Sequence, residues 1–256
     1  MKKFILITSI LLIGLVYFGL PTDNSKRTFP TFNQEKNSAT YTPWSNPTFE
    51  ELHQALYFRE AATFQIKNKK MVPLEQIAPS FQQAILAMED RKFYDHLGFD
   101  WEGMVRAGLV NLQKGSIEEG ASTITQQVAK NLFLTQEQNY SRKAKEVYLA
   151  IQLEKNFSKS DILTIYLNTI YYGSNAYGIS EASRNYFDKD PMRLTLAESA
   201  MLAGTIPAPS LYSPHVNLGL AKERQKIVLT VMQKLGIITP PQYEEALNEK
   251  IYIAPL

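Results

Sequence analysis

Acidic, basic and aromatic side chains crowd residues 89–100, where the sequence most strongly indicates chemistry. The segment opens on Glu89 and Asp90, continues through Phe93 and His96, and ends at Asp100. It directly follows apolar residues that recur at helical spacing. A carboxylate at a helix end, surrounded by cations and aromatic rings, has a pKa that its neighbours set. Taken alone, the segment is either a catalytic site or a polar turn.

A second polar concentration, residues 119–131, carries groups suited to binding an anion. Ser122 or the threonine after it is a candidate N-cap of a helix on which Gln126, Gln127 and Lys130 lie about one turn apart. Backbone N–H groups at a helix N-terminus attract anions, and a lysine adds a point charge. The alternative interpretation is a capped surface helix with an ordinary polar face.

A third group consists of Arg142, Lys143 and Glu146 at helical spacing. The planar guanidinium group of an arginine can bind two phosphate oxygens at once, so a basic pair beside a carboxylate suits a diphosphate ligand. The alternative is a set of exposed ion pairs, each of which stabilises a helix by only about 0.2–0.5 kcal/mol.

Tyrosines and glycines alternate in residues 171–179. Aromatic faces stack on sugar rings, which makes Tyr171 a candidate substrate-binding residue. The same composition is also typical of a tight turn between helices that tyrosines pack. His53 and His215 lack metal-ligand spacing to any partner, and His96 stands alone among charged residues, so the chain is not expected to bind zinc.

The N-terminus predicts a membrane anchor. Residues 4–20 form an uncharged apolar run of 17 residues, and a membrane-spanning helix needs about 17–25. No small-x-small cleavage pattern follows it. Lys2 and Lys3 place the N-terminus in the cytoplasm. We therefore expect a cytoplasmic tip and transmembrane anchor in residues 1–20, a linker in 21–46, and an extracytoplasmic domain in 47–256.

Composition and periodicity set the fold class. The chain has 256 residues, a net charge of +2 and no cysteine. The near-neutral charge argues against a nucleic-acid-binding protein, and without cysteine there is neither a disulfide nor a thiolate nucleophile. Strand signals are confined to a short piece near residues 64–66, so we expect a mainly α domain. The helical pattern is strongest near residues 79–88, 122–132, 147–153, 162–166, 196–202, 221–235 and 240 onward.

In this order, the three polar blocks resemble the peptidoglycan glycosyltransferases of family 51. The family pattern E-D-x-x-F-x-x-H-x-G-x-D is matched at each fixed position from Glu89 to Asp100, and G-A-S-T-[IL]-T-Q-Q is matched at residues 120–127. The R-K-x-x-E block falls on Arg142, Lys143 and Glu146. The resemblance extends from about residue 48 to the C-terminus.

The resemblance implies a lysozyme-like helical fold with two lobes and a polymerase that acts on lipid II. Glu89 would be the general base on the 4-hydroxyl of the acceptor sugar, and Glu146 the second carboxylate, in the donor site. The groups expected to bind the substrate, most of them around its diphosphate, are Ser122, Gln126, Gln127, Lys130, Arg142, Lys143 and, from its aromatic setting, Tyr171. Those expected to support Glu89 are Asp90, Phe93, His96 and Asp100.

Further expectations concern cofactors, partners and location. No cofactor is expected to be obligatory, although a Mg²⁺ or Mn²⁺ ion could accompany the substrate diphosphate. The partners would be lipid II, the growing glycan chain, the bilayer and other cell-wall synthesis proteins, at the outer face of the cell membrane. Residues 101–115 either dip into the bilayer interface or pack on the domain. Because Ser-x-x-Lys and Lys-Thr-Gly are absent, no transpeptidase activity is expected.

Two other functions remain open on the sequence. A muramidase-like hydrolase could use a similar helical fold but would not need a cluster of phosphate-binding cations. A non-catalytic, membrane-tethered partner of the wall-synthesis machinery would not need Glu89.

Overall fold

The computed structural model describes residues 58–60, 62–63, 65–67, 71–103, 105, 122–134 and 140–255, all within one compact unit, Ser45–Leu256. The predicted anchor (residues 1–20) and linker (21–46) lie outside the described residues, as does most of residues 101–115. Within the described part of the chain, no helix has both the length and the hydrophobicity that a bilayer span requires.

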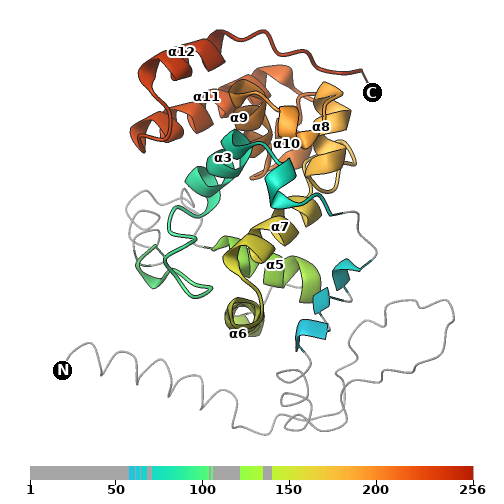
Figure 1. The fold of residues 1–256 in the computed structure, drawn as a ribbon, viewed down its shortest axis with the longest axis vertical. Helices are drawn as coiled ribbons and strands as arrows, with labels where there is room; N and C mark the ends of the chain where they lie inside the picture. Colours follow the sequence, from blue (N-terminus) through green and yellow to red (C-terminus); the bar gives the residue numbers. More distant parts are fainter. Residues whose placement is uncertain are drawn as a thin grey trace, which may run out of the picture. The chain divides into compact units, whose positions relative to one another are not determined.

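The described residues form a mainly α-helical domain, which confirms the predicted fold class (Figure 1). Each predicted helix is present. The predicted strand near residues 64–66 is wrong, because residues 65 and 66 are helical. The α-helices are α3 (Pro79–Glu89), α5 (Ile124–Phe133), α6 (Tyr140–Asn156), α7 (Lys159–Thr169), α8 (Ile179–Phe187), α9 (Leu196–Thr205), α10 (Pro209–Tyr212), α11 (Leu218–Lys234) and α12 (Pro240–Asn248).

Local signals set where these helices begin. Pro79 begins α3. Proline has no backbone N–H, and at this position the N–H would have no acceptor within the helix, so no hydrogen bond is lost. α5 begins at a capping box: the Thr123 side chain accepts a hydrogen bond from the backbone N–H of Gln126, and the Gln126 side chain accepts one from the backbone N–H of Thr123. The same reciprocal pair, Thr239 and Gln242, starts α12. Caps therefore fix the start of the helix that carries Gln126 and Gln127.

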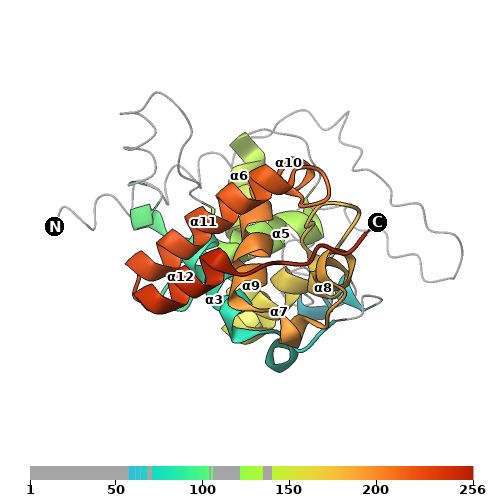
Figure 2. The same ribbon diagram turned by 90° about the horizontal axis from the view of Figure 1, so that it is seen from above.

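One packed group of helices centres on α9, which contacts both α3 and α11 (Figure 1). Gly204 makes this packing possible, because a Cβ atom at this position would lie 2.9 Å from the Cβ of Arg224 on α11. α12 in turn packs on α11, as the view from above shows (Figure 2). The result is a rigid support for α3, whose last residue is Glu89.

A second packed group consists of α5, α6 and α7, with α5 in contact with both of the others. Fully buried apolar residues such as Ile124, Val128 and Ile162 join them. The ring of Phe81 on α3 lies 6.1 Å from that of Tyr172, just after α7, and ties the two groups together. Glu89 thus sits where the end of α3 meets α5.

Candidate active site

Glu89 is the last residue of α3 and is partly buried. Its Oε2 accepts a hydrogen bond of 2.7 Å from Nε2 of Gln127 on α5. Burial raises the pKa of the Glu89 carboxyl above its ordinary value, although the Gln127 hydrogen bond and the nearby positive charges oppose that shift. A carboxylate in this state is a stronger base than a free one, yet part of its surface still faces solvent, where a substrate could meet it.

Two cations lie close enough to Glu89 for their charges to favour its ionised form: Arg224 and, less strongly, Lys130. Lys130 belongs to the sequence prediction, whereas Arg224 was missed. Arg224 is held by a hydrogen bond of 3.3 Å to the Gly204 carbonyl and stacks over the ring of Tyr212 at 5.1 Å. The periodicity of α11 could place this arginine near the apolar residues that pack on α9, but it could not place it beside Glu89.

Asp90 directly follows Glu89, and hydrogen bonds hold its carboxylate in place. Its carboxylate accepts hydrogen bonds from His96 Nε2 at 2.9 Å and from the backbone N–H of Ile124 at 3.0 Å. Since the Gly98 N–H donates to His96 Nδ1, the ring proton lies on Nε2. The picture of His96 as an isolated residue is therefore wrong.

The Asp90 contact also corrects the expectation for the N-terminus of α5. The anion that meets its first backbone N–H is the protein's own Asp90 carboxylate, bonded to Ile124. Asp90 joins α5 to α3, which sets the position of Gln127 relative to Glu89.

A buried ion pair holds the loop between α3 and α5. Lys159 Nζ donates to Glu154 at 2.7 Å and to the His96 carbonyl at 2.7 Å, and it lies 4.5 Å from the centre of the buried Phe93 ring. Thr125 also donates to Glu154, at 2.6 Å. Sequence analysis identified Phe93 as a supporting residue but missed Lys159.

Two further contacts complete the loop. Gly98 has φ of +92°, and a Cβ atom there would lie 3.0 Å from the backbone of Ala150, so α6 approaches too closely for any other residue. Asp100 accepts a hydrogen bond of 3.0 Å from the backbone N–H of Gly103. It therefore caps the helical residues that follow, which is a structural role.

Lys143 gathers the second and third polar blocks into one cluster. Its Nζ donates to Ser122 Oγ at 2.9 Å, to Gln126 Oε1 at 3.3 Å and to the buried Glu146 carboxylate. The structure thus brings together four of the predicted site residues. The side chain of Arg142 lies outside the described residues.

Gln126 leaves one hydrogen-bond donor unused in this cluster. The side chain is fully buried, and its Oε1 accepts from the Thr123 N–H and from Lys143. The other end of the amide is Nε2, and this atom has no hydrogen-bond partner among the described residues. A buried donor without an acceptor destabilises a protein by about 1–3 kcal/mol, so a ligand oxygen at this position would be favourable.

Tyr171 stacks on Tyr177 with ring centres 4.8 Å apart, and the backbones of the two residues pair. This supports the interpretation of residues 171–179 as a tight turn. Among the described contacts, none joins Tyr171 to Glu89 or Lys143. The next residue, Tyr172, lies close enough to Glu89 for the carboxylate charge to contribute to its raised pKa.

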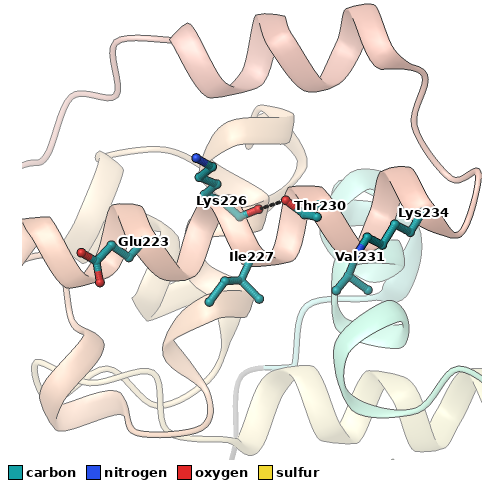
Figure 3. A pocket seen from close by; sticks show the side chains of 6 residues that line it. All are labelled: Glu223, Lys226, Ile227, Thr230, Val231 and Lys234. Carbon is teal, nitrogen blue, oxygen red and sulfur yellow. Dashed lines mark hydrogen bonds between the residues drawn. The ribbon is translucent and has the colours of Figure 1, made fainter.

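A pocket of about 380 Å³ lies away from these groups, along one face of α11 (Figure 3). Ile227 and Val231 form its apolar part, and Glu223, Lys226 and Lys234 lie at its edges. It contains none of the predicted site residues, and because one helix supplies all of its lining it is a surface groove.

Several known proteins are similar in sequence to this chain. Residues 57–233 match the Transglycosylase family profile. The chain is 48% identical to penicillin-binding protein 2D of Bacillus subtilis (strain 168) over 185 residues, covering 72% of this chain and 27% of that protein. It is 38% identical to penicillin-binding protein 1A of Aquifex aeolicus (strain VF5) over 257 residues, covering 99% of this chain and 34% of that protein.

Among solved structures, penicillin-binding protein 1A from Haemophilus influenzae matches with a TM-score of 0.43 and 22% identity, covering 73% of this chain and 18% of that chain. The chain thus spans about a third or less of these relatives. Fold and site define a mainly α-helical domain with a desolvated carboxylate at a helix end. The chain belongs to the Transglycosylase family and is a peptidoglycan glycosyltransferase.

Proposed function

We propose that this enzyme polymerises lipid II into β-1,4-linked glycan strands. The observation that carries the proposal is the Glu89 carboxylate, which is desolvated, bonded to the neutral Gln127 amide and partly open to solvent. In the proposed reaction, Glu89 accepts the proton of the 4-hydroxyl on the acceptor's N-acetylglucosamine. That oxygen forms a bond to the anomeric carbon of the growing chain, the bond to undecaprenyl diphosphate breaks, and the configuration inverts from α to β.

The raised pKa of Glu89 supports the proposed proton transfer. A free glutamate has a pKa of about 4.3 and is a weak base at neutral pH, whereas the general base of an efficient enzyme titrates near its working pH. Burial moves Glu89 in that direction. General-base catalysis of this kind contributes about 10²–10⁴-fold in rate.

The cluster around Lys143 supports binding of the leaving diphosphate. This group gains negative charge as the glycosidic bond breaks, and positioned donors stabilise that charge. The Lys143 ammonium, whose side chain is 39% exposed, is such a donor, and Lys130 lies on α5, the helix that also carries Gln126 and Gln127. Arg142 is proposed for the same role on the family resemblance alone.

A Mg²⁺ or Mn²⁺ ion would enter with the substrate. Among the described residues, no group of three or more acidic or histidine side chains could hold a metal ion. We propose that the substrate diphosphate itself supplies ligands to the ion. The chain would not need a resident metal cofactor, and no transpeptidase activity is assigned to these 256 residues.

We place the enzyme at the outer face of the cell membrane, anchored by residues 1–20. Exposed apolar side chains in the segment after Glu89 support contact with lipid, among them Leu97 (75% exposed) and the helical residues Trp101 (57%) and Val105 (55%). The proposed fold is lysozyme-like with two lobes. The two packed groups of helices, which meet at Glu89, support that description.

The decisive experiment offers the purified full-length protein two substrates, lipid II and finished sacculi, and separates the products by chromatography. We expect glycan polymer from lipid II and no soluble fragments from sacculi. Fragments from sacculi without polymer from lipid II would identify a muramidase-like hydrolase. Activity on neither substrate would favour a non-catalytic partner of the wall-synthesis machinery.

A further inference from the structure

The Gln127 amide can face Glu89 in two ways, and only one of them helps a base. A side-chain amide that turns by 180° exchanges its NH₂ group and its oxygen. With Nε2 toward Glu89, as in this structure, the amide donates to the carboxylate at 2.7 Å. Turned over, it would present an oxygen to an anion. The site therefore needs a group that fixes the amide orientation.

The Tyr166 hydroxyl on α7 is placed to do this. Tyr166 is fully buried, and its hydroxyl donates to Gln127 Oε1 at 3.4 Å. When Oε1 of Gln127 accepts the hydrogen bond from the Tyr166 hydroxyl, Nε2 is the end of the amide that faces the Glu89 carboxylate. Burial raises the pKa of Tyr166 well above its ordinary value, so the phenol stays protonated and remains a donor.

We propose that Tyr166 is a positioning residue for the general base, acting on Glu89 through the amide of Gln127. The inference rests on the proposed function, because it presumes that Glu89 accepts a proton. Nothing requires the Tyr166 ring, buried beneath Gln127, to touch substrate. Its role is then visible in the ionisation of Glu89 and not in the binding of lipid II.

The expected consequence is a change in pH dependence. The Gln127 hydrogen bond lowers the pKa of Glu89, so losing it raises that pKa and leaves less ionised base at a given pH. A substitution at Tyr166 leaves the other titratable groups around Glu89 in place. They are Asp90 beside it, Lys130 of α5, Arg224 of α11 and Tyr172 just after α7.

The test compares the pH profile of kcat for lipid II polymerisation in wild type and Tyr166→Phe. The acid limb should move to higher pH by up to about one unit, and kcat should fall about two- to tenfold on that limb, as loss of one neutral hydrogen bond implies. KM should not change. An unmoved acid limb, or a loss confined to KM, would overturn the proposal.

Tyr172→Phe is the matched control. Tyr172 is also fully buried and senses the charge of Glu89, but its hydroxyl donates to the Leu167 carbonyl at 3.2 Å and does not reach Gln127. The acid limb of the kcat profile of Tyr172→Phe should lie at the same pH as that of wild type. An equal shift in both variants would mean that any buried phenol acts in this way, which would also overturn the proposal.

A double-mutant cycle tests the route through Gln127. In a Gln127→Leu background the amide is gone, so Tyr166→Phe should cause no further shift, whereas additive shifts would contradict the mechanism. If Tyr166→Phe does not fold, 3-fluorotyrosine at position 166 keeps the shape, donates more strongly and should move the limb to lower pH. Wild type that makes no polymer would refute the proposed function itself, while an active wild type with unmoved limbs would refute only the role of Tyr166.

Discussion

Glu89 and Glu146 belong to the same predicted site, yet their carboxylates have different hydrogen-bond partners. Glu89 ends α3 and is bonded to a neutral amide, with its nearest cations acting only through space. Glu146 lies inside α6, is almost fully buried and is bonded directly to the ammonium group of Lys143. One carboxylate has a polar partner without charge, and the other has a counter-ion.

This difference separates two kinds of task. A carboxylate that must accept a proton benefits from burial without a bonded cation, because burial favours its neutral form. A carboxylate bonded to an ammonium group holds that group in place and limits its rotation. We infer that Glu89 carries the proton transfer and that Glu146 orients Lys143, although both were predicted as catalytic.

The largest effect should come from Glu89→Gln. Glutamine fills the same space and can still accept the Gln127 hydrogen bond, but it cannot take a proton from the acceptor hydroxyl. Polymerisation of lipid II should therefore fall by about 10²–10⁴-fold in kcat, measured by the rate of polymer formation. Residual activity above a tenth of wild type would show that another group is the base. Glu89 would then no longer differ from Glu146 in carrying the proton transfer.

A smaller effect is expected from Glu146→Gln. Lys143 would lose its counter-ion and part of its fixed position, but no proton acceptor would be lost. The loss should be about tenfold, which corresponds to one charge-assisted hydrogen bond that is partly open to solvent, and should appear mainly in KM. Lys143→Gln should have a similar effect, and the double variant should be little worse than either single variant. A loss as large as that of Glu89→Gln would make Glu146 a second proton-transfer group.

The sequence predicted the helices well because their signals are local. Pro79 opens α3, Thr123 caps α5, and a pair of prolines opens α12. The strand predicted near residues 64–66 failed for a related reason, since two or three apolar residues cannot distinguish a period of 2 from one of 3.6.

The site could be predicted only in part. Motif spacing indicated Glu89, Gln127 and Lys143, and the structure places each of them beside another predicted residue. Arg224 and Tyr166 were missed as site residues because they reach Glu89 only through the packing of α11 and α7, which depends on tertiary contacts. The partner of His96 was missed because five residues of non-helical loop separate it from Asp90.

The smallest effect, and the one that most sharpens the comparison, is on stability. Since the folded state raises the pKa of Glu89 above 4.5, the ionised side chain opposes folding. That cost is absent below about pH 4 and grows as the pH rises through the raised pKa. Glu89→Gln removes the cost, so the variant should be more stable than wild type at pH 8 and indistinguishable from it at pH 4.

Glu146→Gln should change stability in the opposite direction at pH 8, by less than about 1 kcal/mol, because the side chain of its partner Lys143 is 39% exposed. Urea unfolding of the full-length protein in detergent micelles, with each variant compared with wild type at the same pH, measures both effects. If Glu89→Gln is destabilising at pH 8, the native site stabilises the carboxylate, and burial is not the dominant influence on Glu89. Opposite signs for the two variants would mean that only Glu89 is kept in a state that opposes folding, as expected of a group held ready to accept a proton.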